Sequence, residues 1–279
     1  MNIITWNIQA ALGVDGQVNI NRIAQVIKSM GEADVICLQE ITREKQYNSS
    51  EKQMKHTGLA DDLASHFPDY EMFYGPAIDR IETPGRYYFG NMILSKLPVA
   101  SVFMHRLPQP PDPTTRTMAR QATEITVEYN NNPVRIITTH LEFFATEQRT
   151  AQLQYLTRYV TECRLRFEQP SPTGEGSYVA PPETDRTIVC GDFNLEADTD
   201  HYHFLTCEPS EFTDAWNIAH DDMTHEPTCG IYDHIQWPNG KHCRDFFFVS
   251  SALTSAVKEV IVETDTQASD HQPVKLVLK

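Results

Sequence analysis

The sequence of 279 residues lacks several features that identify common protein classes. Its six cysteines form no CxxC pair and are too sparse for a disulfide-stapled secreted domain, so we expect reduced thiols. The opening residues MNIITWNIQA contain no basic segment followed by a continuous apolar stretch. No later run approaches the ~18 apolar residues of a membrane span. These absences predict a cytoplasmic protein without a membrane span.

Three catalytic signatures are also missing. There is no GxSxG elbow of a serine hydrolase and no GxxxxGK[ST] loop for nucleoside triphosphates. Neither HExxH nor CxxC occurs, which makes zinc a less favoured metal. Basic residues are in deficit, with 23 Lys and Arg against 38 Asp and Glu, and the formal charge of −15 disfavours sequence-blind binding to duplex nucleic acid. A small or lipid phosphate ester is not excluded by this charge.

The apolar content of 40% is sufficient for a sizeable core, and no internal repeat or composition break divides the chain. We therefore expect a single domain over residues 1–279. Short apolar stretches rich in β-branched residues predict strands at residues 1–6, 33–40, 91–95, 122–129, 134–141, 187–193, 245–250 and 273–278.

Two segments have the spacing of amphipathic helices. One follows Asn19 or Asn21, either of which could cap it, and the other runs from Thr146 to about Phe167. So few helices among so many strands favour two stacked mixed β-sheets flanked by helices, an α/β sandwich, over a strictly parallel sheet. Two proline-rich segments, 107–117 and 168–186, are predicted as long loops, either passive connections or rims of a substrate site.

Acid, amide and imidazole side chains follow the predicted strands, where buried runs meet solvent. Strand ends are where α/β proteins assemble their sites, so these side chains are candidates for one shared site. A carboxylate that closes a buried strand is costly unless it is paired or bound to a cation. The candidates are Asn7, Glu40, His140, Asp192 and Asn194 of GDFN, Asp245, Asp270 and His271.

This set of side chains suits the hydrolysis of a phosphate ester. Glu40, Asp270 and Asn7 offer the hard oxygen ligands that Mg²⁺ or Mn²⁺ prefers. The imidazoles and the remaining carboxylates are suited to aligning water and supporting charge on the departing oxygen. The residues therefore predict a divalent-metal-dependent phosphoric ester hydrolase.

The motifs TWNIQ, LQE, GNMILS, TTHL, GDFN, DFFFVS and SDHQPV occur in this order over essentially the whole chain. In this respect the sequence resembles the endonuclease/exonuclease/phosphatase superfamily. The resemblance implies a DNase I-like fold, a four-layer α/β sandwich in which helices flank two stacked mixed sheets.

The resemblance also implies roles for the matching positions. Glu40 would be the principal metal ligand, with Asn7 and Asp270 beside the same cation. Asp192 would orient or deprotonate the attacking water, and Asn194 would hydrogen-bond the phosphoryl group.

Five further positions receive roles in the same way. His271 would stabilise the charge of the transition state, held in orientation by Asp245. His140 would be a further phosphate ligand. Asn91 of GNMILS and Arg120 would bind substrate.

The sequence leaves the substrate open. A small or lipid phosphodiester, a sugar or inositol phosphate, and a nucleic acid all fit the predicted chemistry, and the acidic charge favours the first two. The alternatives are an endonuclease or exonuclease and, less favoured, a catalytically inactive interaction module of the same fold. No obligate protein partner is evident.

Overall fold

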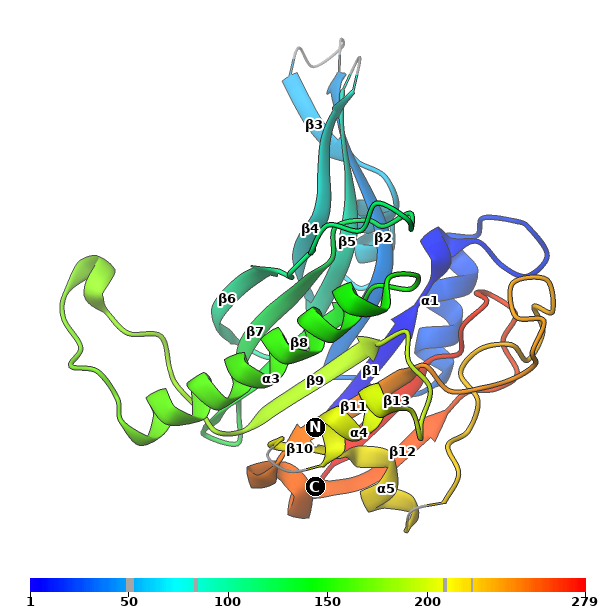
Figure 1. Cartoon of the computed structure of the whole chain (residues 1–279). Coiled ribbons are helices and arrows are strands. Elements are labelled where there is room, and N and C mark those ends of the chain that lie inside the picture. Colours follow the sequence, from blue (N-terminus) through cyan, green and yellow to red (C-terminus); the bar gives the residue numbers. More distant parts are fainter. Residues whose placement is uncertain (49–52, 83–84, 208–209, 222) are drawn as a thin grey trace.

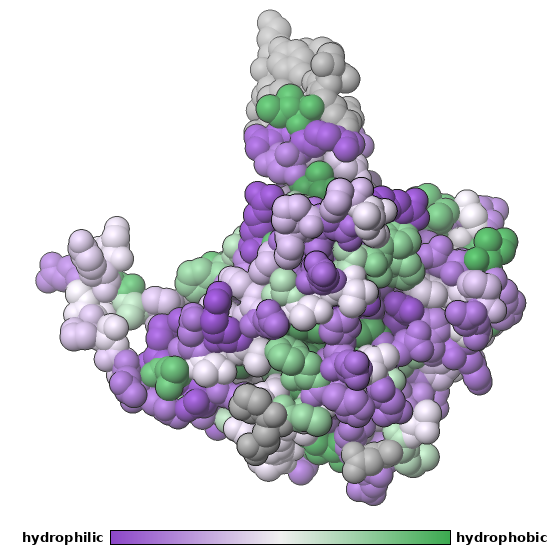
Figure 2. All heavy atoms as spheres, viewed as in Figure 1, coloured by the Kyte–Doolittle hydropathy of each residue, from purple (hydrophilic) through white to green (hydrophobic). Residues whose placement is uncertain are grey.

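Two mixed β-sheets stack face to face and carry helices on their outer faces (Figure 1). The computed structural model describes residues 1–279 except 49–52, 83–84, 208–209 and 222. Within these residues no helix is long and apolar enough to cross a membrane. Hydrophilic residues dominate the face shown in Figure 2, with hydrophobic residues scattered among them.

The first sheet has the strand order β12-β13-β1-β2-β5-β4, and β3 pairs separately with β2. Within it β1 and β2 run parallel, whereas the other neighbours are antiparallel. Strands β2, β4 and β5 continue together as a ribbon beyond the body of the molecule (Figure 1). The strands span β1 Asn2–Asn7, β2 Val35–Asn48, β3 Gln53–Thr57, β4 Glu71–Glu82, β5 Gly85–Ser95, β12 Val257–Val262 and β13 Val274–Leu278.

The second sheet has the order β10-β11-β9-β8-β7-β6, with β8 and β9 as its parallel pair. Each sheet thus contains one parallel pair among antiparallel strands. The strands span β6 Val99–Arg106, β7 Gln121–Tyr129, β8 Asn132–His140, β9 Thr187–Asp192, β10 Phe212–Asp214 and β11 Asp245–Ser250.

The main core lies between the two sheets and is largely aliphatic. Ile3, Ile136 and Ile188 are fully buried there, and so are Cys37 and Cys190. All six cysteines are free thiols, as predicted, and burial raises the pKa of Cys37. These two thiols therefore behave as small hydrophobic groups.

Helices cover the outer faces of both sheets. On the first, α1 (Ile20–Ser29) and α2 (Leu59–Ser65) complete a second apolar cluster. On the second sheet, α3 (Thr146–Glu168) and α4 (Asp200–Thr206) complete a third cluster. The short helix α5 (Ala215–His220) contacts β10 and β11 of the second sheet and β12 of the first. The predicted four-layer sandwich is confirmed.

The predicted strands and both helices are present. Asn19 is the cap of α1, because its side chain accepts a hydrogen bond from the Arg22 backbone N–H. The sequence did not predict β3, β4, β6, β10 and β12, nor the short helices α2, α4 and α5. The edge strand β6 shows why, since five of its eight residues are exposed and its longest apolar run is only the three residues 102–104.

A buried ion pair links β7 and β8 of the second sheet. Arg135 Nε donates to Glu124 Oε1 at 2.9 Å, and both side chains are almost completely buried. Burial alone would raise the pKa of Glu124, but the hydrogen bond from His105 and the charge of Arg135 lower it. The pair stabilises the fold only while Glu124 is ionised.

Arg135→Met should therefore lower the free energy of unfolding by about 3–5 kcal/mol at neutral pH, because it strands a buried carboxylate. A carboxyl with a lowered folded-state pKa contributes stability above its unfolded pKa and loses it as the pH falls. The deficit of Arg135→Met should thus shrink in urea denaturation at acidic pH. Arg158→Met, at an exposed ion pair with Glu162, is the control and should change little. A pH-independent deficit would contradict this account.

Candidate active site

The ends of the two parallel strand pairs open on one edge of the sandwich. In the second sheet Asp192 at the end of β9 is in register with His140 on β8 and with Asp245 on β11. In the first sheet Asn7 at the end of β1 is in register with Gln39 on β2. Side chains far apart in sequence therefore meet at this edge.

Two irregular backbone positions shape the edge. Glu40 adopts a left-handed conformation (φ 59°) where the register between β2 and β5 shifts. Such a bulge redirects a side chain at some cost in strain. Gly191 (φ 133°) lets β9 approach β8 closely, because a Cβ there would lie 2.0 Å from the Thr139 carbonyl oxygen.

Asn7 connects the two sheets across the site. Its amide nitrogen donates to Glu40 Oε1 at 3.1 Å and to Asp192 Oδ2 at 3.0 Å. The Ser269 hydroxyl donates to the Asn7 carbonyl oxygen at 2.8 Å, which ties the Asp270–His271 segment to β1. A single amide thus fixes the relative positions of two carboxylates.

His271 lies among three carboxylates. Its Nδ1 bonds Asp245 Oδ2 at 2.8 Å and its Nε2 lies 3.7 Å from Asp192 Oδ2. The indole N–H of Trp6 donates to the backbone carbonyl oxygen of His271. Burial opposes a charge on the ring, but Asp245, Asp192 and Asp270 hold the pKa of His271 well above its usual value. The ring is therefore an imidazolium at neutral pH, positioned to stabilise negative charge.

The negative charges of Glu40 and Asp270 are only partly balanced by neighbouring groups. Burial raises the pKa of both. The charges of Asp270 and Asp192 raise that of Glu40 further, and the charges of Asp192 and Asp233 raise that of Asp270. The charge of His271 only partly offsets this. An additional positive charge between them would relieve the repulsion.

The pKa values of Asp192 and His140 are lowered, in contrast to those of Glu40 and Asp270. Burial would raise the pKa of Asp192, yet the charge of His271 and hydrogen bonds from Asn7 and the Asn194 backbone lower it. Burial and the charge of Arg120 lower the pKa of His140 to about 3. His140 is thus a neutral ring whose Nε2 lies 3.4 Å from Asp192, and Asp192 is an ionised carboxylate at neutral pH.

A cavity of about 240 Å³ opens at this cluster. Among the predicted site residues, it is lined by Glu40, Arg120, His140, Asp192, Asn194, Asp270 and His271. Asn7 and Asp245 lie behind it and contact lining residues. Asn91 lies apart and donates its amide N–H to the Gln121 carbonyl oxygen, so its predicted substrate contact stays a prediction.

The side chains of Arg120 and Asn194, which both line the cavity, differ in their hydrogen bonds. Nε of Arg120 donates to Glu142 at 3.3 Å, whereas its buried Nη1 has no partner in the described part of the chain. The Asn194 amide donates to the Leu141 carbonyl oxygen. Arg120 therefore has a free donor for an anion, and the Asn194 side chain helps to hold the turn that follows β8.

Two sets of residues could hold a metal ion. Within the described residues, Asp192, Asp245 and His271 bring one potential ligand atom each within 4.8 Å of one another. In that trio the imidazolium already balances charge and Nδ1 is engaged with Asp245. The other set is the predicted one, Asn7, Glu40 and Asp270, whose oxygens suit a hard cation and whose two carboxyl groups repel each other.

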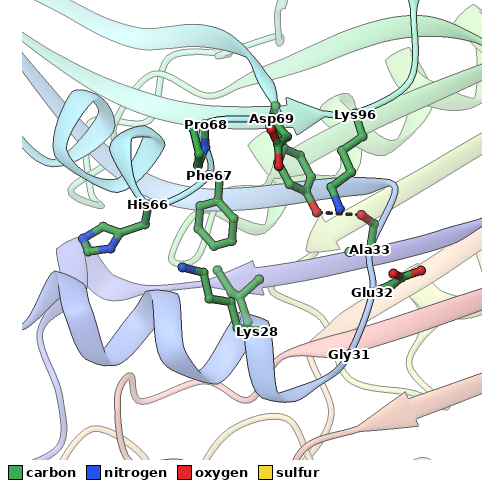
Figure 3. A pocket seen from close by; sticks show the side chains of 11 residues that line it. Lys28, Gly31, Glu32, Ala33, His66, Phe67, Pro68, Asp69 and Lys96 are labelled. Atoms are coloured by element: carbon green, nitrogen blue, oxygen red, sulfur yellow. Dashed lines mark hydrogen bonds between the residues drawn. The ribbon is translucent and has the colours of Figure 1, made fainter.

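Two of the larger cavities contain no such buried cluster among the residues that the structure describes. One, of about 690 Å³, has Glu196 and Asp198 on its wall, both exposed to water. The other, of about 470 Å³, lies between α1 and the end of α2 (Figure 3). There Lys28 lies over the Phe67 ring, Lys96 lies over the Tyr70 ring, and the Tyr70 hydroxyl donates to the Ala33 carbonyl oxygen.

The sequence did not single out part of the cavity wall. Arg116 lies at the end of the first proline-rich loop and Met118 follows it, so this end of the loop borders the cavity. The second loop, 168–186, projects from the far end of the molecule (Figure 1). Phe143, Phe144 and Trp237 also line the cavity, and only the FF after TTHLE would have been a sequence signal for two of them.

Comparisons with known proteins agree with this architecture. The model of the Endonuclease/Exonuclease/phosphatase family matches residues 4–271. No curated protein matches the chain. Similar solved structures include a Leptotrichia buccalis member of that family, with a TM-score of 0.69 and 17% identity over 100% of this chain and 99% of the other.

Two further similar structures belong to proteins with a known activity or a bound ligand. A Bacteroides thetaiotaomicron mannosyl-6-phosphatase has a TM-score of 0.68 and 16% identity, covering 100% of this chain and 99% of its own. D. rerio TDP2, complexed with a single-strand DNA product, has a TM-score of 0.63 and 18% identity, covering 99% of this chain and 97% of its own. Likenesses at this identity show the shared fold.

The repulsion at the site predicts that Asp270→Asn stabilises the metal-free protein. In chelator at pH 8 the free energy of unfolding should rise by on the order of 1 kcal/mol, since one buried charge is removed. A carboxyl whose folded-state pKa is raised costs stability above its unfolded pKa and regains it as the pH falls through the folded value. The gain should therefore diminish as the pH falls into the acidic range. The control Glu32→Gln, in an exposed loop, should show no such gain, and destabilisation by Asp270→Asn would disprove the repulsion.

Proposed function

Because the chain belongs to the endonuclease/exonuclease/phosphatase family of phosphoester hydrolases, we propose that it hydrolyses phosphate esters with a divalent cation, Mg²⁺ or Mn²⁺. One observation carries this proposal. Glu40, Asp192, Asp270 and His271 line a single cavity, although they come from three separate segments of the chain.

The donor set fits a hard divalent cation. Glu40 and Asp270 would be its carboxylate ligands, with the amide oxygen of Asn7 beside them. The raised pKa values of the two carboxyl groups support this choice, because such a pair gains most from a cation. When bound, the cation supplies charge neutralisation for the phosphoryl oxygens.

The chain's own residues would perform the remaining steps. Asp192, ionised at neutral pH, accepts a proton from the attacking water and is held in place by the amide of Asn7. The His271 imidazolium donates a hydrogen bond to the phosphoryl group as negative charge develops there. Asp245 acts through His271 by fixing the orientation of the ring.

Neutral His140 and cationic Arg120 complete the phosphate site. Arg120 Nη1 offers a free buried donor, and His140 offers a ring that is uncharged and so does not compete with the cation for the carboxylates. The Asn194 backbone N–H positions Asp192. This arrangement accepts either a monoester or a diester.

Cleavage of nucleic acid is the second candidate, favoured by the likeness to the TDP2 complex with single-strand DNA. The charge of −15 opposes it, since a polyanion would be repelled at long range. An inactive interaction module is less favoured, because every predicted acid and imidazole of the site is present.

Substitutions should distinguish the two possible metal sets. Glu40→Gln and Asp270→Asn should each weaken Mg²⁺ or Mn²⁺ binding by at least about 10-fold in isothermal titration calorimetry, since each removes an anionic ligand. Asp245→Asn should leave the affinity within a few-fold. Weakened binding in Asp245→Asn, with near-normal affinity in Glu40→Gln and Asp270→Asn, would assign the ion to Asp192, Asp245 and His271 instead.

Activity should depend on Asp192 and His271. On a panel of phosphate esters assayed with each divalent cation and with chelator, Asp192→Asn and His271→Ala should lower kcat by roughly 10²–10⁴-fold. His234→Ala, at an exposed residue of the neighbouring loop, is the control. Normal turnover in both site variants would refute the mechanism. Cleavage of single-stranded DNA whose affinity falls steeply with salt would favour the nucleic-acid candidate.

A further inference from the structure

Three aromatic side chains form one wall of the active-site cavity. This aromatic wall consists of Phe143, Phe144 and Trp237, all of which line the cavity. The ring centroids of Phe143 lie 4.7 Å from Phe144 and 5.8 Å from Trp237. Trp237 in turn meets the His271 ring at 5.7 Å with an interplanar angle of 79°. The wall is thus in contact with the proposed catalytic imidazolium.

Polar contacts from α3 fix the backbone that carries the two phenylalanines. Arg149 Nη1 donates to the carbonyl oxygens of Glu142 and Phe143 at 2.8 and 2.9 Å. Gln152 Oε1 accepts from the Glu142 backbone N–H, and the Glu142 carboxylate accepts from that of Phe144. Phe144 is nevertheless 45% exposed. A large ring held in a fixed position and left half-exposed is typical of a recognition surface.

Trp237 has an unused hydrogen-bond donor at the same wall. Its side chain is only 5% exposed, and its Nε1 has no acceptor in the described part of the chain. The other two indoles are satisfied: Trp6 donates to the His271 carbonyl oxygen and Trp216 to that of Met223. A buried N–H without an acceptor is unfavourable, and such groups concentrate where a ligand completes them.

Building on the proposed function, we propose that the aromatic wall binds a ring carried by the phosphate ester, while the Trp237 indole N–H donates to an oxygen of that ester. Ring faces pack well against aromatic side chains, and the Arg116 guanidinium, 4.4 Å from the Phe144 ring centroid, adds a planar cation at the mouth. Trp237 and Phe144 are then substrate-specificity residues.

The dimensions and charges of the cavity favour a ring over other groups. A volume of about 240 Å³ accommodates one ring beside a phosphate but not a long acyl chain. A polyphosphate would require several free cations. Among the described residues, the cations that line the cavity are Arg116, Arg120 and the His271 imidazolium, and of these Arg120 is already paired with Glu142 and His271 with Asp245.

Benzyl phosphate and n-hexyl phosphate, with their methyl diesters, test the ring subsite. Phe144→Ala should lower kcat/KM for the benzyl ester about five-fold or more and leave the hexyl ester within about two-fold. The intrinsic reactivity of each ester cancels when variant and wild type are compared on the same compound. Phe204→Ala, another half-exposed phenylalanine remote from the cavity on α4, is the matched control and should affect neither.

The indole donor is tested by Trp237→Phe, which keeps a ring against His271 and removes the N–H. kcat/KM should fall about two- to ten-fold on both esters, mainly through KM, because the hydrogen bond serves binding. The melting temperature should not fall, since the lost donor had no partner. Trp216→Phe, which removes a satisfied indole N–H, should show the reverse: a lower melting temperature and unchanged kcat/KM.

The outcomes separate this subsite from the reaction itself. Hydrolysis of both esters with equal losses in Phe144→Ala, or a loss confined to the hexyl ester, would overturn the ring subsite and leave the proposed function intact. Unchanged kcat/KM in Trp237→Phe would overturn the hydrogen bond. No hydrolysis of either ester by the wild type, with any divalent cation, would overturn the proposed function and the subsite with it.

Discussion

The concentration of carboxyl groups at one edge of the sandwich is the constraint on which the site depends. Glu40, Asp192, Asp245 and Asp270 face a single imidazolium, that of His271, in surroundings where burial makes each negative charge expensive. The charge of this ring lowers the pKa of Asp192, and the ring is hydrogen-bonded to Asp245, although burial raises the pKa of Asp245. Glu40 and Asp270 have no such hydrogen bond to the ring, and a structure that retains this pair without a cation gives up stability.

The fold explains how these groups come together. Each sheet contains one parallel strand pair, and the carboxyl ends of β1 and β9 open on the same edge, where the Asn7 amide spans from Glu40 to Asp192. Behind this edge Gln39 donates to Thr5 and Thr138 in the largely apolar interface between the sheets. The site thus rests on buried polar contacts that fix the register of one sheet against the other.

Much of this was predictable from the sequence. The strand patterns and the order of the motifs predicted the sandwich. They also predicted most of the residues that line the cavity, because the apolar runs show where each strand ends. The edge strand β6 was missed, since its exposed residues carry no periodic signal. The aromatic wall was missed because Phe143 and Trp237 are distant in sequence and look like ordinary hydrophobic residues until the fold places them 5.8 Å apart. Likewise, the sequence could not show that Asn91 would bond to the Gln121 backbone.

The account centres on the claim that Glu40 and Asp270 share a divalent cation. Anomalous diffraction from a crystal containing Mn²⁺ tests it directly, since the peak reports the position of the ion independently of catalysis. We expect one strong peak within ligand distance, about 2.0–2.3 Å, of carboxylate oxygens from both Glu40 and Asp270. A peak bound only by Asp192, Asp245 and His271, or no peak at millimolar Mn²⁺, would contradict the claim.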